Sequence, residues 1–174
     1  SLNQMLKDEL SSYDLAESQA LLEGDPCKAA AVRLDAAMNG NFLGTGLGTD
    51  EDAVFKAIEE CKDPDERRKL AEAFKTRTGQ DLDKAMNKEL SGAELDVATA
   101  LMAGDKAGAA AARVQVAVDG LGTDEEGIYA QLENKSDDER KAIIAAYNTR
   151  YGKDGTDFNS VLNDELSGLS LQKA

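Results

Sequence analysis

Two copies of one six-residue stretch contain the residues best suited to binding chemistry. Gly-Leu-Gly-Thr-Asp-Glu begins at Gly46 and again at Gly120. Glycine tolerates backbone angles that other residues avoid, so a Gly-x-Gly loop can turn several main-chain carbonyl groups inward together. Such a ring of oxygens suits a hard cation such as Ca²⁺, which takes about six to eight oxygen ligands.

A carboxylate should complete such a site, because carbonyl groups alone leave the charge of the ion uncompensated. Each stretch is followed, after 43 and 45 residues, by a Glu-Leu-Ser-Gly motif at Glu89 and at Glu165. Both glutamates stand at the end of a predicted helix. We interpret the two loops with their distant glutamates as candidate calcium sites. A plain turn that starts a helix is the alternative interpretation.

The two stretches belong to a longer internal repeat. When the sequence is shifted by 80 positions, residues 6–40 align with residues 86–120 without a gap, and 14 of the 35 pairs are identical. The first copy carries six extra residues, 41–46, at its loop. The repeat divides the chain into the terminal helices of an incomplete repeat (1–24), a full repeat (25–103) and a second repeat that lacks its last helix (104–174).

The pattern of each repeat predicts about five short helices. Apolar residues recur at spacings of three or four, and alternation with period two is not sustained anywhere. The predicted fold is therefore all-α, a bundle of short helices with Phe74 and Tyr147 in its core.

Helix ends are also readable from the sequence. Thr49 and Thr123 each have an acidic residue three positions later, which is the spacing of a capping box, so we expect both threonines to cap helices. Ser136 is expected to open a later helix. Gly79 and Gly152 are expected to end helices in the left-handed conformation.

Composition excludes several functional classes. The chain has no histidine, the usual general base, and we expect no enzymatic activity. A formal net charge of −14 opposes binding to nucleic acid or directly to an anionic membrane. Cys27 and Cys61 are interpreted as small buried hydrophobic residues in a reducing compartment. A set of basic residues is interpreted as a solvated or salt-bridging helix face rather than a lipid-binding patch: Arg67, Arg68, Lys69, Arg140 and Lys141.

The motifs together resemble those of one protein family. The segment from GLGTDEDAVF to GAELDVATALM (46–102) resembles an annexin repeat along its whole length, and the segment from DGLGTDEE to LNDELSG (119–168) resembles a second. Each contains GxGT, a helix end of the form (F/Y)xTxxG and ELSG, in the order typical of the family. The resemblance implies two calcium sites, each made of three main-chain carbonyls and one carboxylate: Gly44, Gly46 and Gly48 with Glu89, and Val118, Gly120 and Gly122 with Glu165.

The resemblance also implies a function. It indicates calcium-dependent binding to anionic phospholipid membranes by a cytoplasmic, peripherally membrane-associated protein, with a protein partner or self-association on membranes as a further possibility. Thr45 and Asp119 stand where the family commonly has lysine, and the insertion at 41–46 could expose Phe42 and Leu43 as a membrane-touching tip. The loop insertion and the missing lysines motivate the alternative function, an annexin-fold protein-interaction or cytoskeletal scaffold with weak or lost calcium binding.

Overall fold

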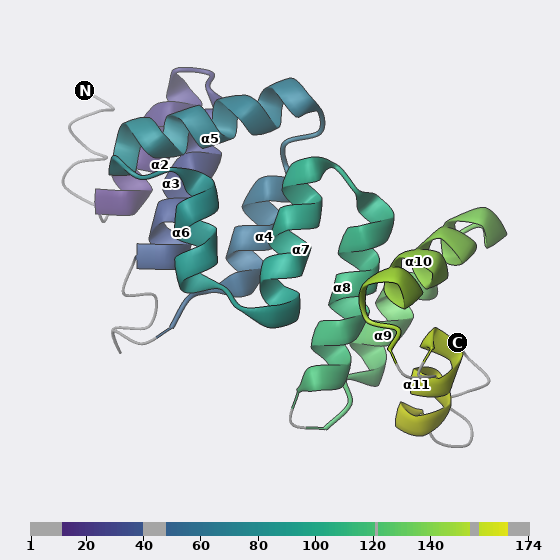
Figure 1. Cartoon of the computed structure of the whole chain (residues 1–174). Helices are drawn as coiled ribbons and strands as arrows, with labels where there is room; N and C mark the ends of the chain where they lie inside the picture. Colours follow the sequence, from purple (N-terminus) through teal and green to yellow (C-terminus); the bar gives the residue numbers. More distant parts are fainter. Residues whose placement is uncertain (1–11, 40–47, 121, 154–156, 167–174) are drawn as a thin grey trace. The chain divides into compact units, whose positions relative to one another are not determined.

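The computed structural model describes residues 12–39, 48–120, 122–153 and 157–166 (Figure 1). These residues form ten helices and no β-strand, which confirms the predicted all-α fold. The helices, labelled as in Figure 1, are α2 (Ser12–Leu22), α3 (Pro26–Asn39), α4 (Glu51–Glu59), α5 (Pro64–Thr78), α6 (Leu82–Glu89), α7 (Gly92–Ala103), α8 (Lys106–Asp119), α9 (Glu125–Leu132), α10 (Asp137–Arg150) and α11 (Phe158–Glu165).

The chain forms two compact units, and the first is built around α3. This unit comprises residues 1–91 and 101–104, and within it α3 packs against α2, α4 and α5. One helix can contact three others closely because much of its buried surface is alanine, which lets neighbouring backbones approach. Phe74 of α5 is fully buried, as predicted.

The second unit, residues 92–100 and 105–174, repeats this plan around α8. The helix α8 buries four consecutive alanines, 109–112, and packs against α9 and α10. Tyr147 of α10 is buried as predicted and meets the ring of Phe158 edge-on, with centroids 5.1 Å apart. Both cysteines, Cys27 and Cys61 of the first unit, are buried free thiols, as expected.

The helix α7 is shared between the units. Its residues 92–100 belong to the second unit, while residues 101–104 belong to the first. A compact unit therefore begins with the last helix of one sequence repeat and continues with four helices of the next. The repeat boundaries at residues 24 and 103 remain a prediction, since they rest on sequence similarity rather than on contacts.

Two predicted helix ends are confirmed and one is wrong. Ser136 forms a capping box with Glu139, and Gly79 ends α5 with a left-handed φ of 75°. Gly152 is not left-handed. Its amide bonds the carbonyl of Asn148, and a Cβ atom at this position would lie only 2.5 Å from that oxygen. Glycine is needed there because the backbone approaches closely, not because of its φ angle.

The expected threonine caps are also wrong. The residue after each threonine is the cap: Asp50 accepts a hydrogen bond from the amide of Ala53, and Asp124 accepts one from the amide of Gly127. A carboxylate at the first position outside a helix satisfies an exposed amide and also meets the positive end of the helix dipole. Each threonine consequently lies two residues before the first residue of its helix, and its hydroxyl is left for another partner.

Replacing Asp50, which caps α4, should destabilise the fold more than replacing Asp52, the acidic residue three positions after Thr49. We expect Asp50→Ala to lower the free energy of unfolding by about 1 kcal/mol. Asp52→Ala, in the exposed first turn of α4, should lower it by only a few tenths of that amount, because it loses only a dipole interaction. Urea unfolding followed by circular dichroism measures both, and equal losses would contradict the assignment of Asp50 as the cap.

Candidate calcium sites

Both Gly-x-Gly loops are closed by the same main-chain hydrogen bond. The amide of Asp50 bonds the carbonyl of Ala37 at 3.0 Å, and the amide of Asp124 bonds the carbonyl of Ala117 at 3.0 Å. The two alanines are equivalent in the internal repeat and both are buried. The six extra residues of the first copy lie between the bonded residues, so the insertion leaves the base of the loop unchanged.

The backbone of the second loop presents carbonyl oxygens on a short turn. Gly122 has a φ of 89° and its counterpart Gly48 has a φ of 93°, a region in which side chains other than glycine are strained. A Cβ atom at Gly120 would lie 3.4 Å from the Gly122 carbonyl oxygen, which shows that this carbonyl turns back over the loop. Val118 lies in the last turn of α8, where carbonyls have no amide partner within the helix. Gly44 and Gly46 lie outside the described residues.

In both units the carboxylate of the distant glutamate lies within hydrogen-bonding distance of the threonine hydroxyl in the loop. The Thr49 hydroxyl donates to the Glu89 carboxylate over 3.4 Å, and the Thr123 hydroxyl donates to the Glu165 carboxylate. The sequence separations are 40 and 42 residues, so the fold brings these groups together twice. The leucine after each glutamate, Leu90 or Leu166, is 3% exposed, and its burial anchors the end of the helix that carries the carboxylate.

The two carboxylates differ in their charged neighbours. Lys88 donates to the Glu89 carboxylate with its Nζ atom 2.5 Å from Oε1. In the second copy the equivalent residue is Asp164, so Glu165 has an acid where Glu89 has a base. The second carboxylate therefore stands in a more negative setting than the first.

A polar network beside the second loop was not predicted from the sequence. The Gln115 side chain donates to Asp119 over 2.8 Å and accepts from the Tyr147 hydroxyl over 2.6 Å. Burial, followed by the carboxylates of Asp119 and Glu165, raises the pKa of the Tyr147 phenol. Asp119 and Glu165 thus act electrostatically on the same hydroxyl. The position of Asp119, just before the first glycine of the loop, was the only sequence signal for this network.

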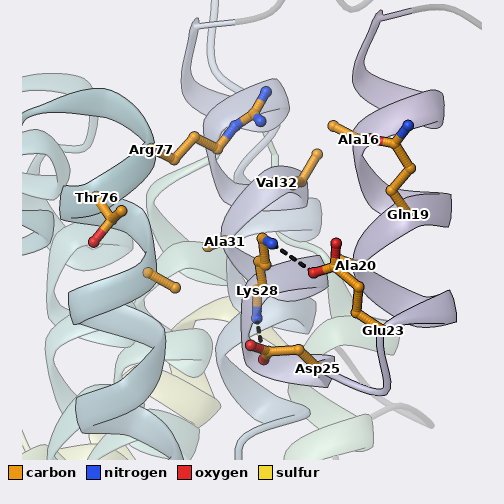
Figure 2. Close-up of a pocket in the computed structure, with 11 residues that line it drawn as sticks. Ala16, Gln19, Ala20, Glu23, Asp25, Lys28, Ala31, Val32, Thr76 and Arg77 are labelled. Carbon is orange, nitrogen blue, oxygen red and sulfur yellow. Dashed lines mark hydrogen bonds and ion pairs between the residues drawn. The ribbon is translucent and has the colours of Figure 1, made fainter.

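The described residues offer less support for other metal or ligand sites. Over the part of the chain that the structure describes, no group of three or more Cys, Asp or Glu residues is arranged to hold a metal ion. The predicted sites are of another kind, since each has one carboxylate and main-chain oxygens. A pocket of about 540 Å³ lies among α2, α3 and α5 (Figure 2), but its charged groups are paired. Lys28 bonds Glu23 at 2.6 Å, and Arg77 bonds Asp35 at 2.7 Å.

The basic residues of α5 and α10 mostly form exposed ion pairs, as interpreted from the sequence. Arg68 pairs with Asp65 and Glu72 at 3.0 Å each, and Lys141 reaches Asp138 at 3.9 Å. Such exposed pairs add little stability. No helix among the described residues is long and apolar enough to cross a membrane.

The bond between threonine and glutamate should be measurable without any ion. In a double-mutant cycle with a chelator present, Thr123→Val and Glu165→Gln should show a coupling of about 1 kcal/mol in the free energy of unfolding, since the bond involves a charged group. The pair Thr49→Val and Glu89→Gln should couple less, because its bond is longer and Lys88 shares the carboxylate. Thr123→Ser, which keeps the hydroxyl, is the matched control. Additive losses at both sites would contradict these bonds.

Comparisons with known proteins identify the family to which this chain belongs. The Annexin family model matches residues 28–101 and 109–171. Annexin A13 of Mus musculus is 34% identical over 124 residues, covering 71% of this chain and 37% of its own, and annexin A5 of Rattus norvegicus is 34% identical over 123 residues, covering 71% and 36%. The structure of chicken annexin V is 27% identical, with a TM-score of 0.42 over 84% of this chain and 45% of its own. The chain thus spans just over a third of the length of these curated relatives. It belongs to the annexin family.

Proposed function

We propose that this chain binds calcium through its two Gly-x-Gly loops and, through the bound ions, anionic phospholipid. Annexins as a family bind phospholipid in a calcium-dependent manner and are generally non-enzymatic. The observation that carries the proposal is the repeated bond between the loop threonine and the distant glutamate. It supports the proposal because one carboxylate near the threonine of each Gly-x-Gly loop, together with main-chain carbonyls, is a donor set that suits a hard cation.

The ligands proposed for the first site are the carbonyls of Gly44, Gly46 and Gly48 with the carboxylate of Glu89. Those proposed for the second are the carbonyls of Val118, Gly120 and Gly122 with the carboxylate of Glu165. A single carboxylate per site implies a weak intrinsic affinity, on the order of 10⁻⁴–10⁻³ M, as in other sites with few charged ligands. Anionic phosphate oxygens would complete the coordination, so calcium and lipid should each strengthen the binding of the other.

The charge of the chain makes an ionic bridge necessary. At a formal net charge of −14, the protein is repelled by a negative membrane surface. The basic side chains of α5 and α10 do not offer a compensating patch, because most of them are paired with acids. Calcium, when bound, supplies the positive charge between the carboxylates of the protein and the phosphates of the lipid.

Removing the two carboxylates should abolish calcium-dependent membrane binding. We expect the chain to sediment with phosphatidylserine vesicles at millimolar calcium and to stay in solution with a chelator. Glu89→Gln and Glu165→Gln should each raise the calcium concentration needed by about tenfold, which corresponds to roughly 1.4 kcal/mol of lost binding free energy. The double variant should not sediment. Glu133→Gln, which removes an exposed acid outside both loops, is the control.

The same experiment separates the proposed function from its alternative. If sedimentation does not depend on calcium, or if the double variant sediments as the unchanged chain does, the proposal is wrong. Isothermal titration that detects no calcium binding, together with capture of a defined protein partner, would instead support a protein-interaction scaffold that has kept the annexin fold without its ions.

The neighbours of the two carboxylates should set different affinities. Lys88 competes with an ion for Glu89, so Lys88→Gln should strengthen calcium binding at the first site by about threefold, as expected for the loss of an exposed ion pair beside the ligand. The reciprocal change, Asp164→Lys, should weaken the second site. Calorimetric titration of each variant, in the background of a Gln substitution at the other site, measures the two effects. Affinities unaffected by either change would show that these side chains do not compete with calcium.

A further inference from the structure

The two cysteines of the chain meet inside the first unit. Cys27 is the second residue of α3, and Cys61 lies two residues after the end of α4, 34 positions further along the sequence. Both are free thiols, and a hydrogen bond links the two side chains. Two sulfur atoms in contact are the arrangement from which a disulfide forms.

The first turn of α5 holds both cysteines in place. The Cys27 thiol donates to the main-chain carbonyl of Glu66 over 3.6 Å. Arg67 donates from Nη1 to the carbonyl of Cys61 over 3.1 Å. The amide of Lys62 donates to the Glu66 carboxylate over 2.6 Å, which ties the segment after α4 to the same turn. Since α3 packs against both α4 and α5, the contact between the sulfurs is set by helix packing within the first unit.

Burial limits the reagents that can react with this pair. Cys27 is 8% exposed and Cys61 is 6% exposed. Burial, followed by the charges of Asp25 and Glu66, raises the pKa of the Cys27 thiol. Burial, followed by the neighbouring Cys27 and Glu66, raises the pKa of Cys61 to about 12. Because the thiolate is the reactive form, both thiols are protonated and slow to react at neutral pH. A small uncharged oxidant suits such a pair better than a bulky one.

The second copy of the repeat has no equivalent pair. Ala107 aligns with Cys27 at a shift of 80 positions, and Asn134 aligns with Cys61 at a shift of 73 positions. The second unit nevertheless packs its central helix against two others, as the first unit does. The common fold therefore does not require thiols at these positions, and their contact in the first unit needs another explanation.

We propose that Cys27 and Cys61 are a redox couple that hydrogen peroxide converts to an intramolecular disulfide. Peroxide first transfers one oxygen atom to one thiol, which gives a sulfenic acid and one water. The other sulfur then attacks the sulfenic sulfur, so that the S–S bond forms, the S–O bond breaks, and the hydroxide leaves with the thiol proton as a second water. Two thiols are oxidised, and one peroxide is reduced to two waters.

The disulfide closes a ring around the first candidate calcium loop. Residues 27–61 contain nearly all of α3, the whole loop and α4. Such a crosslink restricts the unfolded chain and thereby stabilises the folded one. The second unit contains no cysteine, so the crosslink acts on only one of the two loops. This chemistry goes beyond the proposed function, since it requires neither calcium nor lipid.

Peptide mapping of the whole chain, reduced and then treated with hydrogen peroxide in the presence of a chelator, tests the proposal. A digest made without reductant should contain a species that joins the peptides of Cys27 and Cys61, lighter by two hydrogen atoms than their sum. Dithiothreitol should separate them. In Cys27→Ala the remaining cysteine should gain oxygen atoms instead. Oxygen gained at both cysteines of the unchanged chain without a link, or a link only between two chains, would overturn the proposal.

Equilibration with a glutathione redox buffer separates a contact built by the fold from chance closure of a flexible chain. The ratio of disulfide to dithiol should be about a hundredfold higher in the native chain than in urea, because the crosslink stabilises the folded state. The matched control combines Cys27→Ala with Lys28→Cys, which moves the thiol to the adjacent exposed position of α3. The control should show no such increase. Equal ratios in the native and unfolded states of the unchanged chain would show that the fold does not favour the disulfide and would overturn the proposal.

Discussion

The burial of one alanine-rich helix in each unit is the constraint on which the loops depend. The last turns of α3 and α8 carry Ala37 and Ala117, which are buried in the cores. Their carbonyls accept the hydrogen bonds that close the two loops. Since these carbonyls cannot move without disturbing a close-packed interior, the base of each loop is fixed by the core itself. The number of residues between the two hydrogen-bonded ends of the loop can vary, because lengthening a loop adds little to the entropic cost of closing it. This explains how one loop holds six residues more than the other.

The sequence predicted the larger arrangement better than the details. The repeat, the helical spacing and the order of motifs were enough to predict an all-α fold and to single out Glu89 and Glu165. The assignment of the caps failed because threonine and aspartate are both good capping residues. Where the two are adjacent, the sequence does not show which of them directly precedes the first residue of the helix. The hydrogen bond from the loop base decides it, since it brings the aspartate to the helix start. Gly152 was misassigned because glycine is required both where two backbone segments approach closely and where φ is left-handed. The residue type alone does not distinguish these two causes.

The shared helix α7 explains why sequence repeats and compact units do not coincide. A repeat is a unit of sequence, but residues 92–100 of its last helix belong to the compact unit that follows. The equivalent helix α2 packs against α3 within the first unit. Only the final residues of α7, 101–104, belong to the preceding unit. The contact boundary therefore falls within a helix, whereas the boundary read from sequence similarity falls after it.

The net charge limits how this protein could hold a membrane. Two calcium ions carry four positive charges against a formal net charge of −14, so the chain would remain strongly negative with both sites filled. Attraction over long distances cannot then be the basis of binding, and in physiological salt such attraction is screened beyond about 8 Å in any case. The contact must be local, with each ion coordinated at the same time by a loop and a phosphate. In that proposed arrangement the position of one carboxylate would matter more than the total charge, because the ion would be bound only where the carboxylate and the loop carbonyls meet. The threonine hydroxyl that holds the carboxylate at the loop is therefore as much a part of the proposed site as the ligands themselves.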